Sequence, residues 1–265
     1  MRTPTAHPAP GIIGHNRTML TPHYCVFPPE GIMDSLLPSW PGCIIRFQTS
    51  PAMGARFAQA LLIAPAGQGS AGVLDDGLEH FFYVQQGAFT LTADGQAATL
   101  RPGGFAYIPA GMAYALTATA EGEARAIWVK RPYEAVPGIA RPGLKIGHRD
   151  TAPREDNGPR WRILLLGTKD MSMDFEMNIM CYAPGAHFWC IETHVMEHGL
   201  VMLQGQALQL LGRDWHEIWT GDFVWMGPYL PQQIYATGNE VAEYLLYKDV
   251  NRDVRFEGDA ARGGA

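Results

Sequence analysis

The sequence predicts an all-β chain that folds into two jelly-roll β-barrels with few short helices. Short apolar runs alternate with turn residues, and no stretch keeps a period of 3.6 residues. The 30 Gly and 20 Pro supply many turns, and an aromatic share of 11% suits strands. In addition, the two halves of the chain repeat one spacing, which together with short strands is typical of duplicated barrels.

The repeat is carried by a histidine and the two glycines that follow it. In both halves the first glycine comes seven residues after the histidine, and the second glycine comes sixteen residues later. The matched positions are His80, Gly87 and Gly103 in the first half and His198, Gly205 and Gly221 in the second.

Composition divides the chain into five parts. Residues 1–45 are Pro-rich and predict an N-terminal arm with short strands. The two barrels are expected over residues 46–131 and 161–256, where strand-like runs and turns alternate. Between them, residues 132–160 place five prolines among charged and small residues, which predicts a semi-rigid linker. Residues 257–265 predict a flexible tail.

Charge and hydropathy exclude several classes of partner. A net charge of −6 gives no basic footprint for nucleic acid or for an anionic membrane. No apolar run approaches the roughly 20 residues that a membrane-spanning helix needs, and Met1 to Gly14 lacks an apolar signal core. The four cysteines form no Cys-x-x-Cys pair, which favours reduced thiols. We therefore expect a cytoplasmic protein that binds neither nucleic acid nor membrane.

One segment of the second half has the spacing of a metal site. Glu192, His194 and His198 place a carboxylate and two imidazoles at offsets 0, 2 and 6. On an extended strand Glu192 and His194 share a face, and His198 completes the set after a short bend. Imidazole with carboxylate suits Mn, Fe, Zn or Ni better than metals that prefer thiolates. The alternative is a pair of solvated histidines near a turn.

Residues 185–252 resemble the cupins, which usually carry His-x-His, then Glu and Gly, with a fourth His in a second motif. Here the ligand types are permuted, with glutamate first and glutamine last. This permutation, with the run Tyr-Leu-Leu-Tyr-Lys-Asp-x-Asn-Arg from Tyr244 to Arg252, resembles the (S)-ureidoglycine aminohydrolase family. Its members are manganese-dependent bicupins of allantoin breakdown. The motifs are Gly185-x6-Glu192-Thr193-His194-x3-His198-x6-Gly205 and Gly221-Asp222-Phe223-Val224-Trp225-Met226.

The resemblance implies one Mn²⁺ per chain, with Gln232 in the slot of the last cupin histidine. It assigns substrate binding and catalysis to Tyr244 and Lys248, which share a strand face by the period of two. Glu192 is a further candidate for proton transfer. The alternative is a core tyrosine and a solvated lysine. Gln209 departs from the family, whose members commonly carry tyrosine there. The implied metal ligands are Glu192, His194, His198 and Gln232.

Other polar residues are expected to serve different roles. The first barrel should hold no metal, because Leu74 and Asp76 occupy its histidine slots and Tyr114 the last slot. Glu79 and His80 are therefore assigned to folding or inter-barrel contacts.

Two residues near the metal motif are also expected outside the ligand set. His187 lies five residues before Glu192, so strict alternation sends it to the opposite face. Glu197 precedes His198 and should face away from the metal for the same reason.

The activity that the resemblance implies is metal-dependent hydrolysis of (S)-ureidoglycine to (S)-ureidoglycolate and ammonia. The alternatives are an Fe(II) cupin dioxygenase, since histidines with a carboxylate also bind iron, and a non-enzymatic small-molecule-binding cupin. The expected partners are a small-molecule substrate and further copies of the chain, because cupins often bury one sheet against a second copy.

Overall fold

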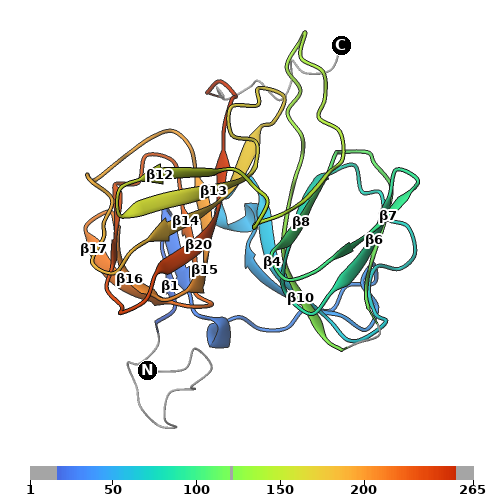
Figure 1. Cartoon of the computed structure of the whole chain (residues 1–265), viewed down its shortest axis with the longest axis horizontal. Helices are drawn as coiled ribbons and strands as arrows, with labels where there is room; N and C mark the ends of the chain where they lie inside the picture. The colour runs from blue at the N-terminus through green and yellow to red at the C-terminus, as the bar shows by residue number, and fades with distance from the viewer. Residues whose placement is uncertain (1–16, 120–121, 255–265) are drawn as a thin grey trace.

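The computed structural model describes residues 17–119 and 122–254 and contains two β-barrels side by side (Figure 1). The predicted all-β architecture of two barrels is confirmed. In each barrel a larger antiparallel sheet faces a sheet of three strands. The helical segments in the described part are two short 3₁₀ turns, η1 (Pro29–Gly31) and η2 (Pro51–Met53).

The first barrel combines a six-stranded sheet, β11-β8-β5-β10-β4-β3, with a three-stranded sheet, β7-β6-β9. In β6 the side chains alternate strictly between buried and exposed, which is the pattern of a strand with one face on a core. The strands are β3 (Ile44–Thr49), β4 (Ala58–Ala64), β5 (Glu79–Gln86), β6 (Phe89–Ala93), β7 (Gln96–Leu100), β8 (Gly104–Ile108), β9 (Tyr114–Ala118), β10 (Ala124–Arg131) and β11 (Lys145–His148).

The second barrel combines an eight-stranded sheet, β1-β2-β18-β15-β20-β14-β13-β12, with a three-stranded sheet, β17-β16-β19. Its strands are β1 (Met19–Leu20), β2 (Tyr24–Phe27), β12 (Arg154–Asn157), β13 (Arg160–Leu166), β14 (Phe175–Tyr182), β15 (His198–Gln204), β16 (Gln206–Leu211), β17 (Asp214–Trp219), β18 (Phe223–Met226), β19 (Gln232–Ala236) and β20 (Ala242–Asp249).

The N-terminal arm contributes to both barrels: Trp40 and Cys43 pack in the core of the first barrel, whereas β1 and β2 belong to the second. Its strand β2 pairs antiparallel with β18, so the blue β1 lies among the orange strands in Figure 1. Sequence composition predicted short strands in the arm but gave no information on their partners. Residues 1–16 of the arm and the expected tail over 257–265 lie outside the described residues.

Residues 132–160 are more ordered than a semi-rigid linker. Strand β11 pairs with β8 of the first barrel, and β12 pairs with β13 of the second. Both strands supply hydrogen-bond partners to the backbone of a sheet edge, which stabilises that edge. The five prolines of this segment lie outside the two strands, so its Pro-rich composition did not reveal that strands are present.

The two large sheets pack against each other through a shared apolar cluster. Phe57 of the first barrel stacks on Tyr247 of the second, with ring centroids 3.9 Å apart. Within this interface the Arg131 guanidinium donates to the Tyr247 hydroxyl at 2.9 Å and lies 3.6 Å from both Glu79 and Asp174. The Tyr107 hydroxyl donates to Glu79 at 2.8 Å. A single cation therefore faces two fully buried carboxyl groups.

Glu79 should make stability fall with rising pH. Burial, with the neighbouring Asp174, raises the pKa of the Glu79 carboxyl to about 9. Between the ordinary carboxyl pKa and about 9, the folded state keeps a proton that the unfolded state has released, so unfolding becomes easier as pH rises. We expect Glu79→Gln to flatten this decline between pH 5 and pH 9, measured by chemical denaturation. The exposed control Glu240→Gln should keep the wild-type slope, and equal slopes in all three proteins would contradict this assignment.

Candidate metal centre

The segment before β15 brings the acidic residue of the motif to the cavity of the second barrel. Glu192 and Gln232 exchange two backbone hydrogen bonds of 3.0 Å in an isolated bridge. The extended strand expected for Glu192 and His194 is replaced by this single bridge. His187 pairs with Tyr235 in a second bridge. Between the two bridges, the four residues 188–191 lie opposite the two residues 233–234, so the longer segment bulges.

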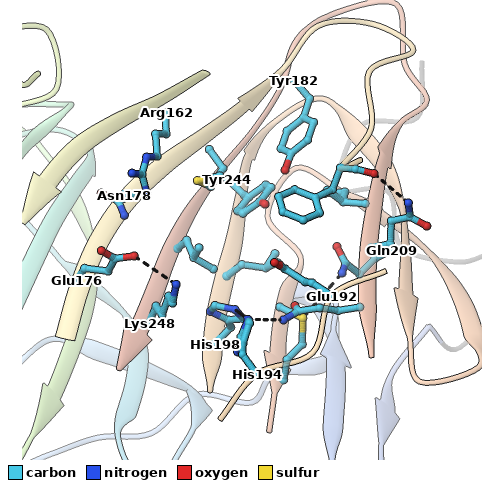
Figure 2. Close-up of a pocket in the computed structure, with 18 residues that line it drawn as sticks. Arg162, Glu176, Asn178, Tyr182, Glu192, His194, His198, Gln209, Tyr244 and Lys248 are labelled. Atoms are coloured by element: carbon cyan, nitrogen blue, oxygen red, sulfur yellow. Dashed lines mark hydrogen bonds and ion pairs between the residues drawn. The ribbon is translucent and has the colours of Figure 1, made fainter. Parts of the chain in front are cut away.

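The three motif side chains converge despite the bulge. Their ligand atoms all lie within 4.8 Å of one another, and within the described residues they are the one cluster of this kind. The two histidine Nε2 atoms are 3.0 Å apart, and the Gln232 side-chain amide lies 3.1 Å from His194 Nε2. Figure 2 shows His194, His198 and Glu192 facing one another.

The hydrogen bonds of the imidazoles leave both facing nitrogens as acceptors. His194 Nδ1 lies 3.0 Å from the carbonyl of Met196, and His198 Nδ1 lies 3.4 Å from that of Tyr247. A carbonyl only accepts, so each Nδ1 carries the proton and each Nε2 presents a lone pair. Burial, followed by His194 and Lys248, holds the pKa of His198 well below its usual value, so its ring is neutral.

Two lone pairs at this separation repel each other unless a cation lies between them. A neutral imidazole pair with a carboxylate is a donor set that divalent first-row metals prefer. The Gln232 amide can present either end by rotation, so its oxygen can face the same point. The residues present therefore fit a divalent metal ion.

Strand β20 supplies the polar wall beside these ligands. Tyr244, Leu246 and Lys248 line one cavity of about 200 Å³ together with Glu192, His194, His198 and Gln232. Lys248 is the cross-strand neighbour of His198. Burial, with the adjacent Tyr182 and Glu192, raises the pKa of Tyr244 far above its usual value, so its phenol stays protonated and donates.

The cavity has a second polar region that sequence reasoning missed. Glu176 and Asn178 of β14 and Arg162 of β13 line it on the side away from the loop of Glu192. A sequence signal for Glu176 and Asn178 was present, because these two polar residues, spaced by two, interrupt an otherwise apolar strand. That strand lies outside the metal motif in sequence, so local residue spacing could not show that the two residues share a cavity with the metal ligands.

The structure also places the three other residues that the sequence analysis discussed near the metal motif. Gln209 is buried and lines the cavity, with its amide nitrogen 3.8 Å from the Met226 sulfur. His187 stacks on Tyr235 and stands outside the three-residue cluster. Glu197 points to the barrel interface, where it accepts from the Trp225 indole at 3.1 Å.

The matching region of the first barrel is closed by its own side chains. His80 lies 2.9 Å from Asp76 and accepts from the Trp128 indole at 3.0 Å. Its ring also packs 5.0 Å from that of Tyr114. Both His80 nitrogens therefore have protein partners.

Comparison with known proteins decides the family. A cupin domain model matches residues 61–130. The chain is 33% identical over 254 residues to a probable (S)-ureidoglycine aminohydrolase of Oryza sativa subsp. japonica, covering 94% of this chain and 81% of the relative. The chain belongs to the (S)-ureidoglycine aminohydrolase family. The resemblance inferred from its motifs is thereby confirmed, and so is the bicupin fold. A second family member, from Escherichia coli K12, is 32% identical and covers 88% of this chain and 91% of the relative.

Solved structures share the fold of this chain. Protein Ylba from E. coli superposes with a TM-score of 0.83 at 29% identity, covering 91% of this chain and 97% of that one. A putative glyoxylate-induced protein from Pseudomonas aeruginosa gives 0.84 at 32% identity and 96% coverage of both chains. Oxalate decarboxylase from Bacillus subtilis shares the fold at 12% identity, with a TM-score of 0.66 over 86% of this chain and 78% of that one. Among the described residues, no helix has the length and apolar character to cross a membrane.

Proposed function

We propose that this protein hydrolyses (S)-ureidoglycine to (S)-ureidoglycolate and ammonia, with one Mn²⁺ per chain. The observation that carries the proposal is the meeting of Glu192, His194 and His198 with Tyr244 and Lys248 in one cavity. Family membership supports the same substrate, because the curated relatives are named (S)-ureidoglycine aminohydrolases.

The ion is Mn²⁺, as the resemblance to the family implies, and the donor set that would hold it is Glu192, His194, His198 and Gln232. Carboxylate and amide oxygens are hard ligands of the kind that Mn²⁺ accepts, and an ion held by these four side chains could also bind a substrate. With one carboxylate ligand the centre keeps a net charge of +1, which would attract the substrate carboxylate and fix the amine beside it.

The reaction replaces the amine on Cα by a hydroxyl group. The oxygen of water forms a bond to Cα, the bond from Cα to the amine nitrogen breaks, and a proton moves from water to the departing amine. Lys248 brings N–H donors and Tyr244 a neutral O–H donor to the cavity, while the Glu192 carboxylate is an acceptor. We assign the positioning of water and the transfer of its proton to these three groups.

The direct test is ammonia release from freshly generated (S)-ureidoglycine, corrected for spontaneous decay, with and without Mn²⁺. We expect release by the Mn²⁺-loaded protein and its loss on chelation. Oxygen uptake with Fe(II) and no ammonia would favour a dioxygenase, and binding without turnover would favour a non-enzymatic cupin.

The enantiomers should differ in rate. If the carboxylate and amine are both fixed at the metal, only one enantiomer places its ureido group in the remaining cavity without a clash. We expect (S)-ureidoglycine to react and (R)-ureidoglycine to be inert, measured as corrected ammonia release from each. Equal rates would rule out a two-point attachment.

Self-association and a cytoplasmic location are parts of the same proposal. Trp189, Ile191 and Tyr229 have exposed apolar side chains that a contact between copies would cover. The four cysteines are free, as expected for a reducing compartment. Light scattering of the purified protein would give the oligomeric state.

A further inference from the structure

We infer that Glu176 and Asn178 form a subsite for the ureido group of the substrate. A ureido group is planar and uncharged, and it carries a carbonyl acceptor beside parallel N–H donors. This inference rests on the proposed function and extends it by fixing which way round the substrate lies. Three features of these two side chains support it: their position, their hydrogen bonds and their charge.

The subsite lies at a distance from the metal ligands that a small substrate can span. Lys248 of β20 pairs with His198 on one side and with Glu176 on the other, so the three form one row across the sheet. Figure 2 shows the Lys248 side chain between the other two. Two strand spacings separate the ends of this row, about 10 Å between Cα atoms. Both ends point into the same cavity, which leaves room for a small elongated molecule between them.

Hydrogen-bonding capacity in this region is incompletely used. Asn178 is 1% exposed, and its Oδ1 lies 3.1 Å from the Thr168 hydroxyl, which also lies 3.3 Å from Glu176 Oε2. One hydroxyl proton can serve only one of these acceptors. Among the described residues the structure shows no partner for Asn178 Nδ2, and Glu176 Oε1 has only the Lys248 ammonium at 3.8 Å. Buried polar groups normally have partners, so these atoms are suited to a ligand.

Charge sets the class of ligand. Glu176 is paired with Lys248, and the third charged side chain of this region, Arg162, is paired with Glu155, so this end of the cavity favours an uncharged polar group. A substrate carboxylate placed here would meet the Glu176 carboxylate, whereas at the other end it would meet the metal. The ureido group complements the subsite directly, because its two N–H groups can donate to the two Glu176 oxygens and its carbonyl can accept from Asn178 Nδ2.

Two stable probes separate this contact from the rest of the site. N-carbamoylglycine has the ureido group but no amine on Cα, so this reaction releases no ammonia from it. N-acetylglycine is identical except that a methyl group replaces the terminal NH₂. By calorimetry on the Mn²⁺-loaded protein, we expect wild type to bind N-carbamoylglycine at least tenfold more tightly than N-acetylglycine.

Substitutions then assign the preference to its residues. Glu176→Gln should abolish the preference, while the matched control Glu217→Gln, on an exposed strand position, should keep it. Asn178→Leu should weaken both probes by a similar factor, because both retain the carbonyl. Thermal unfolding of each variant checks that it is folded.

Several results would overturn the inference. These are no binding of N-carbamoylglycine to wild type, equal affinities of the two probes, or a preference that survives in folded Glu176→Gln. The outcome is separable from the proposed function. Ammonia release from ureidoglycine without a probe preference would reject only the subsite, and a Glu176-dependent preference without ammonia release would reject only the hydrolase.

Discussion

Replacing His194 or His198 by alanine should remove most of the bound metal and abolish ammonia release. Their Nε2 atoms are 3.0 Å apart and both face the Glu192 carboxylate, so loss of either leaves only one imidazole in the cluster. Metal content is measured by elemental analysis after reconstitution with Mn²⁺ and removal of the excess. Wild type should hold one metal per chain.

The control for this experiment is His187→Ala. His187 stands near the same loop but stacks on Tyr235 outside the cluster, so its loss should leave metal content unchanged. Two tightly held metals per chain in wild type, or none after careful reconstitution, would reject the single site. Full metal content in His198→Ala would reject the ligand assignment.

Lys248→Ala and Tyr244→Phe should each lower turnover at least tenfold while metal content stays at one per chain. A tenfold loss corresponds to about 1.4 kcal/mol of transition-state stabilisation. Both side chains line the cavity, but neither belongs to the three-residue metal cluster, so the expected loss is of catalysis and not of metal. Steady-state kinetics with parallel elemental analysis separates the two effects.

The matched control is Lys169→Ala, because the Lys169 side chain is 81% exposed and forms only a surface ion pair with Glu155. It should keep the wild-type rate. Wild-type kinetics in both Lys248→Ala and Tyr244→Phe would show that this face of β20 does not act on the substrate.

The features that could be predicted from the sequence are those with short-range spacing. The seven- and sixteen-residue intervals after His80 and His198 indicated two similar barrels. The period of two along β20 placed Tyr244 and Lys248 on one face, where the structure also has them. Each of these patterns repeats within a few residues, because a strand fixes the direction of its side chains locally.

Features that depend on partners distant in sequence could not be predicted in this way. The pairing of β2 with β18 joins segments about 200 residues apart, and no local pattern marks it. The edge strand β11 uses backbone hydrogen bonds that any sequence without proline can make. The approach of Glu176 and Asn178 to the metal cluster depends on the order of β14, β20 and β15 in the sheet, which is a property of the whole fold.

Titration of metal-free protein with Mn²⁺, with ammonia release from fresh (S)-ureidoglycine as the readout, tests the central claim most directly. We predict that the rate rises in proportion to added Mn²⁺ and levels off at one equivalent per chain. Absence of ammonia release at every Mn²⁺ concentration, or a plateau at two equivalents, would contradict a single hydrolytic metal centre in the second barrel.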